Sequence, residues 1–91
     1  MDYEWDERKR RANLAKHGVD FTDAVAFVWP LAFTSLDARR DYGEPRYVSI
    51  GPVNGRLHVM VWTPRGGKVR VIGLRKANRR EERWYHEHER D

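Results

Sequence analysis

The spacing of hydrophobic and polar residues changes along the chain, and this change predicts helices at both ends with strands between them. The segment Tyr3–Trp5 alternates and predicts a short edge strand. A helix is expected over Glu7–His17, because Asp6 can cap its start and Gly18 can end it. This helix is polar, so Leu14 and a few alanines are its candidates for burial.

A second helix is expected from Asp20 to Pro30, where proline ends it. Its apolar residues recur at the spacing i, i+3, i+4 and i+7 and therefore share one face: Phe21, Ala24, Val25 and Val28. Residues 18–20 leave only a short joint, so the two helices are expected to form a hairpin or corner.

Alternating residues in the middle of the chain predict four further strands. They are expected over Leu31–Leu36, Arg46–Val53, Arg56–Thr63 and Lys68–Leu74. Asn54-Gly55 predicts a tight hairpin, and residues 64–67 predict a second turn. Gly51-Pro52 lies inside the second of these strands and predicts a bulge or a sheet edge.

Asn78 can begin a final helix, and Glu81 completes a capping box with it. This helix is expected to run to the C-terminus. The resulting order, β-α-α-β-β-β-β-α, predicts an α+β fold. Two N-terminal helices are expected to pack on a small antiparallel sheet of four or five strands, which a C-terminal helix closes. Residues 1–91 are expected to form this single domain.

The composition excludes several classes of protein. Cysteine is absent, which excludes disulfides, a thiolate nucleophile and cysteine-bound zinc. No stretch approaches the roughly 20 apolar residues of a membrane span, and the acidic start lacks a signal-peptide core, so a cytoplasmic protein is expected. There is no P-loop or metal-binding motif, and His86 and His88 would not face each other on a helix, so no metal or cofactor is expected.

Positive charge gathers in the second half of the chain. Residues 1–45 hold 7 basic and 9 acidic side chains, whereas residues 46–91 hold 11 basic and 5 acidic ones. The densest run contains eight basic residues: Arg65, Lys68, Arg70, Arg75, Lys76, Arg79, Arg80 and Arg83. Arginine predominates among the basic residues, and its planar donor fork fits a phosphate group.

Arg79 and Arg80 begin the final helix, where cations oppose the helix dipole at a cost of about 0.3–1 kcal/mol each. A bound phosphate or an acidic partner would compensate for this cost. The run of basic residues therefore predicts a site for a polyanion such as nucleic acid. The alternative is a solvated surface with local arginine–glutamate pairs.

The parity of the strands divides their residues between two faces. In Arg56–Thr63 the odd positions are apolar, whereas the even positions include His58 and Trp62. Strict alternation in the next strand places Leu74 on the same face as Arg70. A cation beside Trp62 is one way to hold single-stranded nucleic acid, and the alternative is that Trp62 packs under a helix.

Segments spread over the whole chain together resemble the BrnT family of small bacterial toxins. They are Glu4-Trp5-Asp6, Lys16-His17-Gly18-Val19, Arg46-Tyr47-Val48-Ser49-Ile50-Gly51, Arg56-Leu57, Arg70-Val71-Ile72, Arg75-Lys76-Ala77-Asn78-Arg79-Arg80-Glu81 and Tyr85. One departure is Gly73, where the family often has serine. The resemblance implies a RelE-like fold and a ribonuclease that blocks translation. It also implies a type II toxin–antitoxin system, with a ribbon-helix-helix antitoxin in a heterotetramer that represses its own operon.

The resemblance and the charge pattern together suggest functional residues. Cleavage without a metal ion can use the 2′-hydroxyl of RNA as nucleophile, and the protein must then stabilise charge on phosphorus. The predicted catalytic residues are Arg70 and Arg75 for the phosphate, Lys16 or His17 as phosphate ligand or acid, and Tyr85 as a nearby hydroxyl. The predicted RNA-binding residues are Arg65, Lys68, Lys76, Arg79 and Arg80.

Three aromatic residues are candidates for the footprint of the antitoxin, although each also suits a core: Trp29, Trp84 and Tyr85. Two rival functions use the same basic surface. The first is a non-catalytic module that binds nucleic acid or an acidic partner. The second is a ParE-like gyrase inhibitor.

Overall fold

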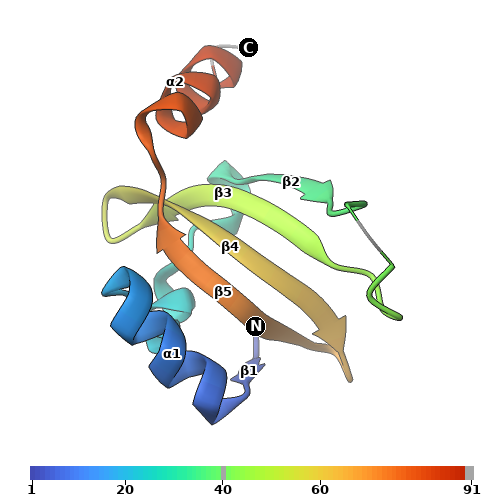
Figure 1. Cartoon of the computed structure of the whole chain (residues 1–91). Helices are drawn as coiled ribbons and strands as arrows, with labels where there is room; N and C mark the ends of the chain where they lie inside the picture. Colours follow the sequence, from blue (N-terminus) through green and yellow to red (C-terminus); the bar gives the residue numbers. More distant parts are fainter. Residues whose placement is uncertain (40, 90–91) are drawn as a thin grey trace.

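A computed structural model describes residues 1–39 and 41–89 and shows a sheet with helical segments on both sides (Figure 1). The strands are β1 (Tyr3–Trp5), β2 (Phe33–Leu36), β3 (Tyr47–Val53), β4 (Arg56–Arg65) and β5 (Lys68–Lys76). The helices are α1 (Glu7–His17) and α2 (Arg79–His88), with short 3₁₀ helices η1 (Phe21–Ala26) and η2 (Trp29–Leu31) between α1 and β2. The predicted α+β class is confirmed. The last helix was expected to run to the C-terminus, but α2 ends at His88 with Glu89 as its C-cap; residues 90–91 lie outside the described residues.

The five strands lie in the order β1-β5-β4-β3-β2. The strands β2 to β5 form an antiparallel meander, as predicted. β1 instead pairs in parallel with β5, with Glu4 opposite Arg70, so the prediction of a purely antiparallel sheet is wrong. Hairpin turns fix the direction only of strands adjacent in sequence, and most of the chain separates β1 from β5.

Both predicted hairpin turns are present. Asn54 and Gly55 have φ values of 50° and 81°, and Gly66 and Gly67 have values of 58° and 77°. Positive φ at both central residues is the geometry of the tight turns that suit twisted strands. The turns therefore set the register of β4 against its two neighbours.

The irregularity of the sheet lies elsewhere than predicted. β3 and β4 pair without interruption past Gly51-Pro52, whereas the register between β4 and β5 shifts at Val61/Trp62. Val61 pairs with Gly73 and Trp62 with Val71, so Ile72 is an extra residue in β5. The extra residue breaks strict alternation and turns Leu74 away from the face of Arg70. As a result, Arg70 and Arg75 share one face of the sheet.

One face of the sheet, which we call the covered face, packs against the helical segments that follow β1. Its buried cluster combines Val19, Phe21, Ala24 and Phe27 with Val53, Met60, Val69, Val71 and Leu74. The opposite face, which we call the open face, carries a smaller cluster of Ile50, Leu57, Val59, Ala77 and Tyr85 beneath α2. Figure 1 shows α1 and α2 on opposite sides of the sheet.

The second predicted helix is a 3₁₀ helix rather than an α-helix. Asp20 caps η1 by accepting a hydrogen bond from the Thr22 amide at 3.0 Å. With three residues per turn, Phe21, Ala24 and Phe27 fall on one side, and all three are buried. Val25, expected on the apolar stripe, is 70% exposed. The α-helical period therefore predicted that Val25 and Val28 are buried with Phe21, whereas the structure buries Phe27.

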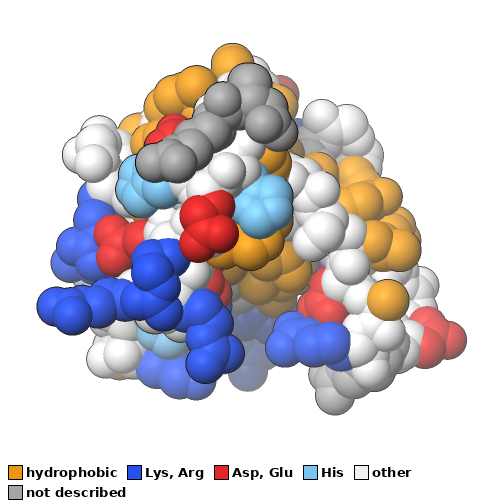
Figure 2. Space-filling view, turned by 90° about the horizontal axis from the view of Figure 1, so that it is seen from above, with side chains coloured by type: hydrophobic (Ala, Val, Ile, Leu, Met, Phe, Trp, Pro, Cys, Tyr) orange, Lys and Arg blue, Asp and Glu red, His pale blue; other side chains and the backbone are white. Residues whose placement is uncertain are grey.

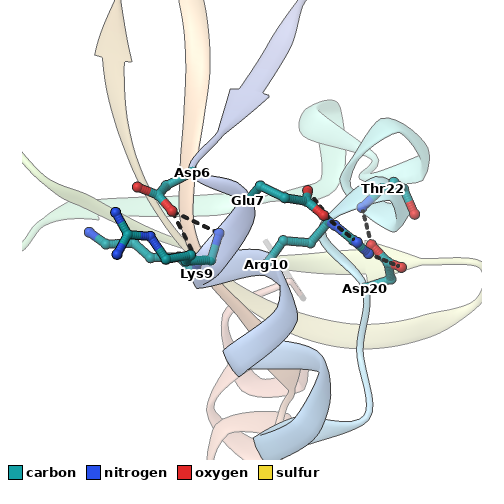
Figure 3. Close-up of polar contacts among 7 residues, drawn as sticks. Asp6, Glu7, Lys9, Arg10, Asp20 and Thr22 are labelled. Carbon is teal, nitrogen blue, oxygen red and sulfur yellow. Dashed lines mark hydrogen bonds and ion pairs between the residues drawn. The ribbon is translucent and has the colours of Figure 1, made fainter.

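A polar network joins the start of α1 to η1 (Figure 3). Asp6 caps α1, as predicted, by accepting from the amides of Arg8 at 2.8 Å and Lys9 at 3.2 Å. The Arg10 guanidinium binds the Glu7 carboxylate at 2.6 Å and the Asp20 carboxylate at 3.0 Å. Asp20 is also the cap of η1, so one arginine ties the two helix starts together.

The rest of α1 is attached by hydrogen bonds rather than by a hydrophobic face. Leu14, the predicted buried residue, is 39% exposed. Asn13 donates to the Leu74 carbonyl at 2.7 Å and to the Val19 carbonyl at 3.0 Å, and it accepts from the Leu74 amide at 3.3 Å. β1 pairs with β5 only as far as Val71, so the Asn13 amide takes the place of a strand neighbour beyond that point.

Replacing Asn13 with alanine is expected to lower the free energy of unfolding by about 1–3 kcal/mol, because it leaves backbone groups of the buried Leu74 without their partner. Replacing the neighbouring Leu14 with alanine is expected to change it by less than about 0.5 kcal/mol. Urea denaturation followed by circular dichroism measures both values. A larger loss for Leu14 than for Asn13 would contradict this mode of attachment.

Candidate functional site

The end of β5 and the start of α2 hold an arginine in a fixed position. Both terminal nitrogens of Arg75 bind the Glu81 carboxylate at 2.8 Å. Glu81 also accepts from the Asn78 amide at 2.9 Å, and Asn78 accepts from the Glu81 amide at 2.8 Å, which confirms the predicted capping box. Arg75 lowers the pKa of the Glu81 carboxyl, and Glu81 raises the pKa of Arg75. Both groups therefore stay charged at neutral pH.

Arg75 remains available to a ligand despite this ion pair. Its side chain is 36% exposed. A guanidinium carries five N–H donors, and a bidentate carboxylate uses only two of them. Glu81 thus orients Arg75 while leaving donors of the same guanidinium for a second anion. Because Glu81 also caps α2, the position of Arg75 is coupled to the start of that helix.

Three further cations lie within five residues of this arginine in the chain, and together with Arg75 they form what we call the junction cluster: Lys76, Arg79 and Arg80. Lys76 pairs with His58, so its side chain leaves β5 on the covered face. All three side chains are exposed, and none makes an ion pair within residues 1–39 and 41–89. Arg79 and Arg80 occupy the first turn of α2, as predicted, where the dipole repels them. Figure 2 shows basic side chains gathered along one side of the molecule next to α2.

The end of α1 lies at the same end of β5. Asn13 contacts Leu74, and Lys16 and His17 follow it by one helical turn. Both side chains are exposed. The structure therefore brings the two predicted α1 residues to the end of β5 where the junction cluster begins, but α1 lies on the other side of the sheet from α2 (Figure 1).

The other predicted basic residues form a separate group at the opposite end of β5, which we call the hairpin group: Arg65, Lys68 and Arg70. Arg65 pairs with Lys68 across the hairpin and lies 3.4 Å from the Glu44 carboxylate. Arg70 binds the Glu4 carboxylate at 2.6 Å. The nine residues of β5 separate Lys68 from Lys76 by roughly 26 Å, so the expected single cluster is two groups.

Arg70 and Arg75 are too far apart to hold one phosphate from both sides. They share the open face, but five positions along β5 separate their Cα atoms by roughly 15 Å. Each guanidinium also binds its own glutamate. The two arginines mark opposite ends of the open face rather than a single clamp.

Tyr85 is part of the packing under α2. Its side chain is 4% exposed, and its hydroxyl donates to the Leu31 carbonyl at 2.7 Å. Burial raises the pKa of this hydroxyl. Its ring packs edge-on against Phe33. This geometry favours a structural role for Tyr85, which anchors α2 to η2, over the predicted catalytic one.

Trp62 packs on the covered face. Its indole N–H donates to Ser49 at 2.8 Å, and its ring stacks on Tyr47 with centroids 5.0 Å apart. Arg70 pairs with Thr63 and so lies on the opposite face. The packing alternative for Trp62 is therefore confirmed, and a base platform made of Trp62 and Arg70 is excluded. His58 is also buried on the covered face.

A groove lies on the open face between α2 and the strands β2 to β4. It has a volume of about 370 Å³ and is lined by Phe33, Thr34, Ser35, Val48, Ile50, Val59, Glu81 and Trp84. Trp84 is 43% exposed, packs edge-on against Phe33 and stacks on His88. Figure 2 shows a hollow beside the basic side chains with hydrophobic side chains on its floor. Sequence reasoning missed this groove, although Trp84 was among its aromatic candidates.

Neither a membrane-spanning helix nor a group of metal ligands is found in the described part of the chain. No helix there is long and apolar enough to cross a membrane. No three histidine, aspartate or glutamate side chains there are arranged to hold a metal ion.

Comparison with known proteins identifies the family. No curated protein matches the chain. Residues 5–81 match the family model described as the ribonuclease toxin BrnT of a type II toxin–antitoxin system. The match runs from β1 to the first turn of α2 and includes Arg75, Glu81 and the whole junction cluster. The chain therefore belongs to the BrnT family: it is a ribonuclease toxin that acts on RNA and has an antitoxin partner.

Proposed function

We propose that this toxin cuts RNA at the junction cluster without the help of a metal ion. One observation carries the proposal: Glu81 fixes Arg75 at the start of α2, next to exposed cations that have no carboxylate partner in the described residues. A guanidinium held in place before the substrate arrives needs no reorganisation when charge develops on phosphorus.

In the proposed reaction, the 2′-hydroxyl of the substrate gives up its proton to water and its oxygen attacks the adjacent phosphorus. The bond from phosphorus to the 5′-oxygen breaks, which leaves a 2′,3′-cyclic phosphate and a 5′-hydroxyl. Arg75 donates to the phosphate oxygens, whose negative charge increases as the new bond forms. Lys76, Arg79 and Arg80 bind neighbouring phosphates and hold the strand. Lys16 or His17 binds the phosphate or protonates the leaving 5′-oxygen.

The hairpin group extends this site along the open face. We propose that Arg65, Lys68 and Arg70 bind phosphates several nucleotides away from the cut. The supporting observation is that Arg70 lies on the same face as Arg75, at the other end of β5. Arg70 is thus assigned to binding in this scheme, and Arg75 to the cleaved phosphate.

The resemblance to the family supports the finer features of the system. We propose that the antitoxin is a ribbon-helix-helix protein, that toxin and antitoxin form a heterotetramer, and that this complex represses its own operon. We also propose a RelE-like arrangement of the fold and action in the cytoplasm, where translation can be blocked.

Incubation of the purified toxin with total RNA, with and without EDTA, tests the proposed reaction. We expect cleavage that the chelator does not reduce. Cleavage abolished by EDTA and restored by a divalent cation would exclude the metal-independent route. Intact RNA in both samples, together with tight binding of nucleic acid, would favour the non-catalytic module. Intact RNA together with inhibition of gyrase would favour a ParE-like toxin.

Gly73 offers a test of the one departure from the family pattern. It lies on the open face between Arg70 and Arg75, and an added Cβ would be 3.9 Å from the Val61 Cβ, an ordinary contact. Gly73→Ser is therefore expected to fold and to raise the cleavage rate by about two- to tenfold through one added hydrogen bond. Gly73→Ala, which adds no hydroxyl, is expected to match the parent. Equal rates for the two variants would show that the hydroxyl has no role.

A further inference from the structure

The groove on the open face has the chemistry of a peptide site. Its floor consists of aliphatic side chains, namely Val48, Ile50 and Val59, and its wall contains Phe33 and Trp84. Its volume of about 370 Å³ lies within the range of ligand pockets. Such a floor suits apolar side chains, since burial of their surface is favourable wherever water is displaced.

Cations rim this apolar floor on the side of α2. Glu81 lines the groove and holds Arg75 beside it. Arg80 precedes Trp84 by four residues, so the two lie on the same face of α2. An occupant that fills the groove and also carries acidic side chains would therefore meet Arg75 and Arg80.

The far side of the groove is an edge of the sheet. β2 is the last strand in the order and pairs only with β3 among the described residues. Phe33 and Ser35 of β2 pair with Ile50 and Val48 of β3, so their side chains lie on the open face and line the groove. An edge strand presents backbone N–H and C=O groups with which another chain can pair.

Nucleic acid fits this groove less well than a peptide does. Bases bind proteins mainly by stacking on aromatic or guanidinium planes. The floor here is aliphatic, and one side of the Trp84 ring is already stacked on His88, with centroids 4.0 Å apart. The apolar floor and the cationic rim together fit a protein segment with apolar and acidic side chains.

We infer that the antitoxin binds this groove with a segment that places apolar side chains on Val48, Ile50 and Val59 and acidic side chains against Arg75 and Arg80. The partner follows from membership of a type II toxin–antitoxin family. A consequence, which rests on the proposed function, is that the bound segment removes Arg75 and Arg80 from RNA. Neutralisation is then direct competition at one surface.

The test measures binding of the full-length antitoxin encoded beside the toxin, by titration calorimetry, and RNA cleavage by the toxin alone. Ser35→Glu places a charge in the groove, and Trp84→Ala removes part of its wall. We expect each to raise Kd at least about tenfold while cleavage by the free toxin changes by less than about twofold. Ala12→Glu, an equally exposed change on α1, is the matched control and should leave Kd unchanged.

The outcomes separate this inference from the proposed function. If neither groove variant changes the Kd for the antitoxin, the inference is overturned. It is also overturned if Ala12→Glu raises this Kd as much as the groove variants do. Reduced cleavage with unchanged Kd would place RNA, not the antitoxin, in the groove. If the unmodified toxin does not cleave RNA, this result would count against the proposed reaction but would not affect the measured binding of the antitoxin. Ser35→Glu removes no packing contact of α2, so it decides the matter if Trp84→Ala unfolds. Raising the salt concentration should also weaken binding, because it screens the acidic contacts.

Discussion

Replacing Arg75 with alanine is expected to lower the rate of RNA cleavage by about 10²-fold or more, whereas replacing Arg70 with alanine should lower it by less than about tenfold. Both arginines lie on β5, share the open face and bind a glutamate, and their side chains are 36% and 26% exposed. They differ in their surroundings. Arg75 stands among the exposed cations of the junction cluster, whereas Arg70 is at the opposite end of β5.

The comparison separates a catalytic charge from a charge that only binds. Loss of a donor that stabilises developing charge lowers kcat, whereas loss of a distant phosphate contact raises KM. Arg75→Lys should recover only part of the rate, because an ammonium cannot reproduce the two-point contacts of a guanidinium. Single-turnover cleavage of a short RNA measures these rates, with circular dichroism to establish folding. Equal losses for Arg70→Ala and Arg75→Ala would show that the two ends of β5 act as one site.

The features that could be predicted from sequence are those that a few neighbouring residues determine. Asp6 and Gly18 bound α1, and Asn78 and Glu81 form the capping box, because a helix end depends on backbone groups within one turn. The Asn54-Gly55 turn is similarly local, because its two residues adopt positive φ. The extent of α1 is therefore the same in the prediction and in the structure.

Features that depend on the rest of the fold were predicted less well. The extra residue at Ile72 reverses which residues of β5 lie on each face from that point on, and no local sequence pattern indicates it. The apolar spacing of η1 suits an α-helix, but the residues that pack on the sheet are Phe21, Ala24 and Phe27, which follow the 3₁₀ period. α1 has no apolar face to reveal its position, since polar contacts of Asn13 and Arg10 attach it.

The candidate site shows the same division. Sequence located the basic residues but joined two groups that β5 holds roughly 26 Å apart. The sequence placed Glu81 in the capping box, and therefore near the end of β5, but it did not show that Glu81 binds Arg75. The partner of Arg70 was not, because Glu4 reaches it only through the parallel pairing of β1 with β5. Tyr85 matched the family pattern, but its role depends on which face of α2 is buried, and the sequence did not show that Tyr85 lies on this face.

The double replacement Arg79→Gln and Arg80→Gln is expected to lower RNA cleavage about 10- to 100-fold at moderate salt while making the protein more stable. Each arginine lies at the start of α2, so its removal relieves about 0.3–1 kcal/mol of repulsion with the helix dipole. The loss of activity follows from two fewer phosphate contacts. The dependence of log Kd on log salt should fall by about 1.4 for single-stranded RNA.

A matched double replacement exists at the start of the other helix. Arg8→Gln and Lys9→Gln remove the same charge from exposed positions in the first turn of α1. This variant should also gain stability, but less than the α2 variant does, because Asp6 attracts the two cations that it removes. It should leave cleavage and the salt dependence of cleavage unchanged. Urea denaturation and cleavage assays at several salt concentrations measure these quantities. If the α1 variant lost as much activity as the α2 variant, net charge rather than the junction cluster would bind the RNA. Opposite effects of one replacement on stability and on cleavage would identify a surface maintained for its ligand at the expense of the fold.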